Sequence, residues 1–217
     1  SQEVRSGEAR ARAEQALVWV AAGLEDEGIE LIVLGGLVPE ILTRGVDLGS
    51  AAHLGTTDVD LLLVTHVDQR DDLRAVEARL TALGFAPDGD GWRWRGKVDG
   101  RAVKIEFLCD LDTVREKDLV TPVGCKRLRA VNLRGTGYVA RDWEREELRA
   151  PGPDGESLSV RVKFAGLAGY LLAKMVAVRS RGEEKDYYDF AYVLIHNQAG
   201  GPQQAARDRR GRAVPHI

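Results

Sequence analysis

Apolar residues recur at helical spacing near the start of the chain and again in its last third. Between residues 8 and 27, Ala13, Leu17 and Leu24 fall on one face of a helix, and Gly28 follows as a terminator. The same pattern recurs further along, with a proline tolerated in a first helical turn. The sequence therefore predicts helices at residues 8–27, 37–45, 69–85, 166–181 and 183–197.

Short apolar runs rich in β-branched residues lie between these helices and predict strands. They are expected at residues 29–34, 57–65, 92–96, 101–110, 125–132 and 158–164, with a loop at 46–56 and a loop or broken helix around Trp143. Because strands and helices alternate, the predicted fold class is α+β (α/β mixed), with a small mixed β-sheet flanked by helices and a helical C-terminal part.

Composition argues against a strongly basic nucleic-acid-binding protein, a zinc-binding protein and a membrane-spanning protein. The net charge of −3 gives no global attraction to nucleic acid, so such a partner would need a local basic patch. The run Arg207, Arg209, Arg210 and Arg212 is one candidate, although the glycines and proline around it favour a flexible tail. Two cysteines without zinc spacing, no apolar run of membrane-span length and no secretory signal lead us to expect a cytoplasmic protein without a membrane partner.

Two aspartates, Asp58 and Asp60, open the predicted strand at 57–65. With 34 acids in 217 residues, about five pairs at this spacing are expected by chance, so the spacing alone is weak. However, this pair lies at the N-terminal end of an apolar strand, where side chains two positions apart point to the same face. Paired carboxylates of this kind are typical ligands of Mg²⁺.

Glu106 is a third acid, set in an alternating strand between Ile105 and Phe107. If its strand pairs beside 57–65, it can face both aspartates, and three carboxylates can hold two metal ions that clamp a phosphoryl displacement. Plainer interpretations remain open. Asp58 suits a turn or cap, Asp60 suits a pair with an arginine, and Glu106 suits the solvent face of an edge strand.

The stretch "LIVLGGLVPEIL" runs from a strand through Gly35 and Gly36 into a helix. Glycines permit close backbone approach, and the N–H groups that follow can bind a phosphate. Taken alone, a tight turn between two elements explains these glycines better.

The types of these residues and their order along the chain resemble the motif of the DNA polymerase β-like nucleotidyltransferase superfamily. The matching pieces are Gly35-Gly36, Asp58-Val59-Asp60 and Glu106. The gap between Gly36 and Asp58 is longer than is usual there. The resemblance implies that Asp58, Asp60 and Glu106 bind the metal, and that Gly35, Gly36 and Thr57 help to bind the nucleotide.

The stretch "LLAKMVAVRSRGEEKDYYDFAYVL" is similar to the helical signature of the AbiEii-type (abortive infection, toxin-antitoxin) nucleotidyltransferases. The matching positions are Lys174, Arg179 or Arg181, Lys185-Asp186 and Asp189. The resemblance implies that Lys174 contacts nucleotide phosphates and that Asp186 belongs to the active site. From the residues alone, Lys174 either snorkels or has an anionic partner. Asp186 suits the first turn of a helix, and Asp189 suits an ion pair with Lys185.

The expected activity is metal-dependent transfer of an NMP from an NTP to an acceptor hydroxyl, with Mg²⁺ or Mn²⁺ as cofactor and pyrophosphate as product. The expected catalytic residues are Asp58, Asp60, Glu106, Lys174 and Asp186. We expect three parts of the chain: a catalytic core (1–132), a helical part completing the site (133–200) and a flexible tail (201–217).

The acceptor is open at this point. The toxin resemblance implies RNA, such as tRNA, or a protein hydroxyl, with a cognate antitoxin as partner, whereas an aminoglycoside-type small molecule is the alternative. A basic groove beside Asp58 would favour RNA and an acidic pocket a cationic small molecule. A third hypothesis is a non-catalytic nucleotide-binding or interaction module, which predicts that one of the three acids is turned away or held by an arginine. His53 and Trp92 with Trp94 are weaker candidates for lining a nucleotide pocket.

Overall fold

The computed structural model describes residues 7–24, 27–29, 31–46, 53, 56–63 and 72–203. The helices are α1 (Gly7–Ala22), α2 (Val38–Leu42), α4 (Arg74–Ala82), α5 (Leu167–Arg181) and α6 (Glu184–His196), with 3₁₀ turns η1 (Gly35–Leu37) and η2 (Thr136–Arg141). The strands are β1 (Ile32–Leu34), β2 (Asp58–Leu62), β3 (Ala86–Asp88), β4 (Arg93–Val98), β5 (Arg101–Cys109), β6 (Leu119–Val120), β7 (Ala130–Asn132), β8 (Trp143–Pro151) and β9 (Ser157–Ala165).

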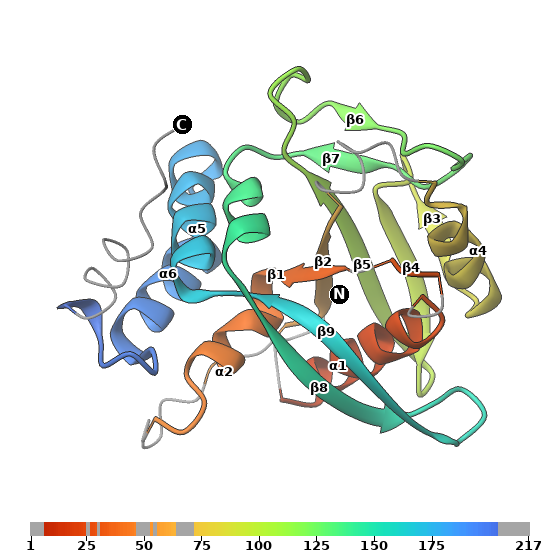
Figure 1. Ribbon diagram of the computed structural model, residues 1–217, viewed down its shortest axis with the longest axis horizontal. Coiled ribbons are helices and arrows are strands. Elements are labelled where there is room, and N and C mark those ends of the chain that lie inside the picture. The colour runs from red at the N-terminus through yellow and green to blue at the C-terminus, as the bar shows by residue number, and fades with distance from the viewer. Residues whose placement is uncertain are drawn as a thin grey trace.

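The strands form one twisted sheet in the order β3-β4-β5-β2-β1-β9-β8, with β7 joining β5 at one end and β6 pairing with β7 (Figure 1). The sheet is mixed, because β2 runs parallel to β5 and β9 parallel to β1, whereas β1 and β2 are antiparallel. Helix α1 lies on this sheet, and α5 and α6 stand beside it next to η2. The predicted α+β class with a mixed sheet flanked by helices is confirmed.

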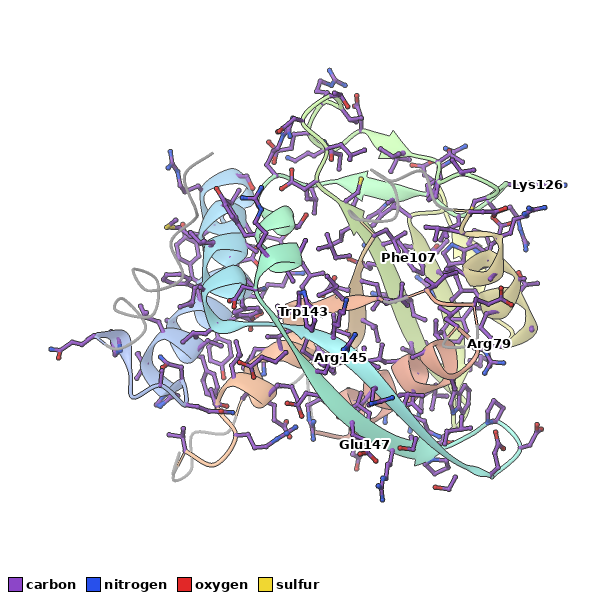
Figure 2. All side chains as sticks on the ribbon, viewed as in Figure 1. Arg79, Phe107, Lys126, Trp143, Arg145 and Glu147 are labelled. Atoms are coloured by element: carbon purple, nitrogen blue, oxygen red, sulfur yellow. The ribbon has the colours of Figure 1, made fainter. Side chains whose placement is uncertain are left out.

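Burial separates the two faces of the central strands. On β5, Val103, Ile105 and Phe107 alternate into the core, and Phe107 points inward among other side chains (Figure 2). On α1, Leu17 and Val20 are fully buried and belong to the same apolar cluster. Each such side chain contributes about 1.5–3 kcal/mol through burial. The alternate positions of β2 and β5 are thereby turned to the opposite face, where the polar residues lie.

The interpretation of the segment around Trp143 as a loop or broken helix is wrong. Trp143 begins β8, which pairs with β9 along its whole length in a long hairpin. The apolar alternation that reveals a strand is missing from β8, because it is an edge strand on which Leu148 is the one buried residue. Trp143 packs instead beneath cations, with Lys163 Nζ 4.2 Å and Arg145 Cζ 5.3 Å from its ring centroid.

Other sequence predictions fare unevenly. The strands near 125–132 and 158–164 and the two C-terminal helices are confirmed as β7, β9, α5 and α6. Residues 143–165 of the part expected to be helical are a β-hairpin, whereas the domain boundary at residue 132 stays a prediction. Most of the 46–56 loop and the arginines of the expected tail lie outside the described residues. Within the described part of the chain, no helix combines the length and apolarity needed to cross a membrane.

Candidate active site

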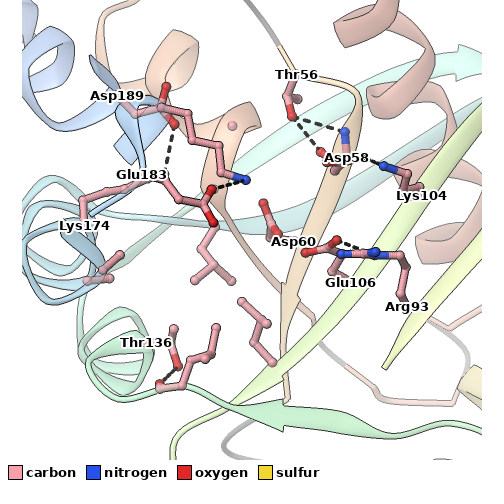
Figure 3. Close-up of a pocket in the computed structure, with 18 of the residues that line it drawn as sticks. Thr56, Asp58, Asp60, Arg93, Lys104, Glu106, Thr136, Lys174, Glu183 and Asp189 are labelled. Atoms are coloured by element: carbon pink, nitrogen blue, oxygen red, sulfur yellow. Dashed lines mark hydrogen bonds and ion pairs between the residues drawn. The ribbon is translucent and has the colours of Figure 1, made fainter. Parts of the chain in front are cut away.

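Three carboxylates share one face of the sheet at the boundary between β2 and β5. Asp58 and Asp60 alternate with the buried Val59 and Leu61 on β2. The parallel pairing sets Asp60 opposite Glu106 and Asp58 opposite Lys104 (Figure 3). The expectation that the strand at 101–110 lies beside 57–65 is therefore confirmed, and the three acids of the sequence motif are neighbours.

Two of these three acids already have cationic partners. Arg93 Nε donates to Glu106 Oε1 at 2.7 Å, and Lys104 Nζ lies 3.6 Å from Asp58 Oδ1. The Thr57 hydroxyl also donates to Asp58 Oδ1 at 3.2 Å. Within the described residues, Asp60 has no ion pair. The condition set for a non-catalytic module, an acid held by an arginine, is thus met at Glu106.

Asp60 stands in an environment that disfavours its charge. Burial raises its pKa to about 7 and the neighbouring Glu106 adds to the rise, whereas Lys174 opposes it. Asp58 raises the pKa further, and Lys185 lowers it. A cation placed against this carboxylate would relieve the repulsion and restore the ionised form.

The residues present fit one hard cation better than a complete site for two. In the described ranges, no group of three or more His, Cys, Asp or Glu side chains is placed to hold a metal ion. Asp58 and Asp60 nevertheless supply carboxylate oxygens on one face, and Mg²⁺ is commonly held by one or two carboxylates together with substrate phosphates. Glu106 remains a predicted third ligand, and it becomes available only if Arg93 moves away.

Gly35 and Gly36 allow the turn η1 to pack directly against the acidic strand. Gly35 has a φ of +80°, and an ideal Cβ at this position would overlap the carboxylate of Asp60. A Cβ on Gly36 would lie 2.5 Å from Thr56 Cβ. Both glycines line a cavity beside the acids. Because they lack a side chain, they leave room for Asp60 and Thr56, and their backbone is exposed to the cavity.

A cavity of about 920 Å³ extends from the acids toward α5, α6 and the segment that links β5 to β7. Its charged lining is mixed. The acids are Asp58, Asp60, Glu106, Glu116, Glu183 and Asp189, and the cations are Arg93, Arg95, Lys104, Lys117, Arg134, Lys174 and Lys185. Near Asp58, the wall carries the three cations Arg93, Arg95 and Lys104, which pair with Glu106, Asp88 and Asp58 respectively. This row of cations was missed in the sequence, although the alternating cations in "RWRGK" at residues 93–97 are a usable signal.

The tryptophans divide between the cavity and the core. Trp92 lines the cavity, with the Arg93 guanidinium 4.5 Å from its ring centroid, so it can stack against a planar group. Trp94 is completely buried and its indole N–H donates to the Gly91 carbonyl, which makes it a packing residue.

Lys174 reaches the cavity as part of a buried charge network between α5 and α6. Its Nζ lies 3.0 Å from Asp186 Oδ1 and 2.9 Å from Asp189 Oδ2. Asp189 also contacts His53 Nε2 at 3.0 Å, and the His53 ring packs against Tyr192. Lys174 therefore has the anionic partner that its apolar helix requires, and its charge is largely compensated inside the protein.

The other motif residues of these helices are placed as follows. Asp186 is completely buried and does not line the cavity, whereas Lys174 and Asp189 do. The plainer alternative for Asp189, an ion pair with Lys185, is wrong, since Lys185 instead lies 3.4 Å from Glu183. His53, a weaker candidate for lining a nucleotide pocket, is not among the residues that line the cavity and is instead a partner of Asp189.

No protein-family model matches the chain, and no curated protein matches it. Among solved structures, it is similar to the solution structure of the antibiotic-resistance factor ANT(2'')-Ia, at 11% identity over 93% of this chain and 91% of that one, with a TM-score of 0.44. It is also similar to a crystal structure of ANT(2")-Ia in complex with adenylyl-2"-tobramycin. The identity there is 12% over 92% of this chain and 95% of that one, with a TM-score of 0.42. A third similar structure is that of an antigenic nucleotidyltransferase-like protein from Paracoccidioides brasiliensis, at 15% identity over 97% of this chain and 91% of that one, with a TM-score of 0.43. Likeness at this level carries no functional argument.

Proposed function

We propose that this chain transfers a nucleotidyl group from an NTP to an acceptor hydroxyl in a reaction that depends on Mg²⁺ or Mn²⁺. The observation that supports the proposal is the placement of Asp58 and Asp60 on one face of β2, with Glu106 opposite Asp60, at the wall of a large cavity. Paired carboxylates beside a cavity with cationic walls suit a metal-bound polyphosphate.

Asp58 and Asp60 would hold the metal ion, which supplies charge neutralisation for the phosphates when bound. Gly35, Gly36 and Thr57 line the cavity beside these acids, and we propose that they position the triphosphate. The acceptor oxygen attacks the α-phosphorus, the bond to the bridging oxygen breaks, and pyrophosphate leaves. The proton of the acceptor hydroxyl passes to a carboxylate, for which we propose Glu106 after its release from Arg93. Positioning and charge neutralisation carry most of such catalysis.

For Lys174 and Asp186 we propose unequal roles. Lys174 adds positive potential at the cavity, where it lowers the pKa of Asp60, and can approach nucleotide phosphates from α5. Asp186, which does not line the cavity, holds the Lys174 ammonium group through a 3.0 Å contact. It is a positioning residue in this proposal.

For the acceptor, we propose RNA ahead of a cationic aminoglycoside. Arg93, Arg95 and Lys104 lie together on the wall next to Asp58, each paired with one carboxylate. A phosphate-bearing acceptor would meet three cations there when it displaces these carboxylates. The toxin role, a protein acceptor and a cognate antitoxin rest on the AbiEii-type sequence signature alone.

The test is incubation of the protein with each α-³²P-labelled NTP and Mg²⁺, with total tRNA, a protein extract and an aminoglycoside panel as parallel acceptors. We expect label in the tRNA fraction with wild type and none with Asp58→Asn/Asp60→Asn. Asp154→Asn, which changes an exposed acid that does not line the cavity, is the matched control and keeps activity. Label in the aminoglycoside arm instead would refute the RNA acceptor while retaining nucleotidyl transfer.

A second candidate, a non-catalytic nucleotide-binding module, is favoured by the 2.7 Å contact between Arg93 and Glu106. It predicts NTP binding without transfer in all arms, for wild type and for Arg93→Gln alike.

A further inference from the structure

Lys117 differs from every other cation that lines the cavity in the described part of the chain. Arg93, Arg95, Lys104, Arg134, Lys174 and Lys185 each have a carboxylate within 4.0 Å. No described carboxylate forms such a pair with Lys117, whose side chain is exposed to the cavity from the segment between β5 and β6. An unpaired cation inside a cavity is available to an anionic ligand.

The backbone of Lys117 is held in a conformation that lysine rarely adopts. Its φ is +70°, and Asp99 is the other described non-glycine residue with a positive φ. Asp99 precedes Gly100 in the tight turn between β4 and β5, where such values are expected for this residue type. Lysine has no short polar side chain that would stabilise the left-handed region, so glycine or asparagine would suit position 117 better on conformational grounds. Strained residues of this kind cluster at ligand sites.

The segment that carries Lys117 is rigidly braced from the buried side. Its N–H donates to the Asn132 carbonyl at 2.7 Å. The Asn132 side chain, completely buried, donates to the Val114 carbonyl at 2.8 Å and accepts from the Leu111 N–H at 2.7 Å. Arg134 adds bonds to the Val114 carbonyl and to Asp112. The backbone of Lys117 is therefore fixed on the cavity wall, so that ligand binding orders only its flexible side chain.

We propose that Lys117 forms an anion subsite on the wall of the cavity built by the β5–β6 segment, and that it takes a phosphate group. Two sources share this chemistry, the polyphosphate tail of an NTP and a phosphate on an acceptor. The subsite goes beyond the proposed function and does not depend on catalysis, since it concerns metal-free binding by a wall that Asp58 and Asp60 do not form. Glu116, which also lines the cavity beside Lys117, opposes anion binding by its charge.

The experiment is titration by isothermal calorimetry, without divalent metal, of tripolyphosphate in one arm and of ribose 5-phosphate in the other. Lys117→Asn removes the charge while relaxing the backbone. We expect it to weaken binding about tenfold in at least one arm, the loss of one charge-assisted contact, while the thermal midpoint stays equal or rises. Glu116→Gln should tighten the same arm. The arm that responds assigns the source of the phosphate.

Lys126→Asn is the matched control, because Lys126 is an exposed lysine on the outer edge of the molecule and does not line the cavity (Figure 2). It should leave both arms unchanged. Binding that Lys117→Asn weakens no more than Lys126→Asn in either arm would overturn the subsite. Asp58→Asn/Asp60→Asn should retain the metal-free response to Lys117→Asn, so failure of the subsite and failure of the proposed transfer are separate results.

Discussion

Gly35 and Asp60 are in such close contact that any side chain at position 35 would overlap the Asp60 carboxylate, with an ideal Cβ 2.6 Å from Asp60 Cγ. The turn after β1 therefore sets where the central acid of the site can lie. The glycine pair in the sequence is explained here by packing against Asp60 and Thr56, and its phosphate role remains part of the proposed function.

Gly35→Ala should displace Asp60 and destabilise the fold. Gly84→Ala is its control, because Gly84 also has a positive φ, of +78°, but nothing within 4 Å of an added Cβ. Backbone strain is common to both variants and costs about 1 kcal/mol, whereas overlap adds about 1–3 kcal/mol at position 35. Urea unfolding and Mn²⁺ titration measure the difference. Equal losses in the two variants would show that the contact with Asp60 does not matter.

Arg93→Gln should strengthen metal binding. The substitution removes the cation that holds Glu106 and competes with a metal for its oxygens. We expect the Kd for Mn²⁺, measured by electron paramagnetic resonance, to fall by about three- to tenfold. Arg95→Gln removes an equivalent charge from the cavity wall but one paired with Asp88, so it controls for the general potential. An unchanged Kd in Arg93→Gln would mean that Glu106 is no metal ligand.

Lys174→Met should lower the free energy of unfolding by about 3–5 kcal/mol, because it removes the buried cation that Asp186 and Asp189 share. The double variant Lys174→Met/Asp186→Asn should recover part of this loss. Guanidinium unfolding measures both. If Lys174 served only the nucleotide, the single variant would bind NTP less tightly at unchanged stability.

Much of the site could be predicted because its residues obey local rules. Asp58 and Asp60 are two apart on a strand, and Glu106 interrupts an apolar alternation, so their shared face follows from the period of a strand. The partners could not be predicted in this way. The pairing of Arg93 with Glu106 depends on the register of β4 against β5, and the contact of His53 with Asp189 joins residues 136 positions apart. The edge strand β8 escaped detection because little of it is buried.

Glu77 should make the fold sensitive to acid. Burial raises the pKa of this carboxyl, but N–H bonds from Leu128, Arg127 and Lys126 outweigh that effect and lower it below the ordinary 4.5. A lowered folded pKa gives stability that is present above the unfolded value and is lost as the pH falls through the folded value.

Glu77→Gln should therefore cost about 1–3 kcal/mol at pH 7 and progressively less below pH 4.5, the ordinary glutamate value. The measurement is thermal unfolding between pH 3 and pH 7, in steps of about one pH unit. Glu144→Gln, at an exposed acid of β8, should show no such convergence with wild type. A constant difference between Glu77→Gln and wild type over this range would contradict the pKa assignment.

The most direct test of the central claim is the rate of Mg²⁺-dependent pyrophosphate release from NTPs in the presence of total tRNA. Wild type and Asp154→Asn should release pyrophosphate at equal rates, and chelation of the metal should stop both. Asp58→Asn/Asp60→Asn, confirmed as folded by circular dichroism, should show a loss of at least about a thousandfold. Undiminished release by the double variant, or release that survives chelation, would contradict the assignment of Asp58 and Asp60 as the metal-binding pair.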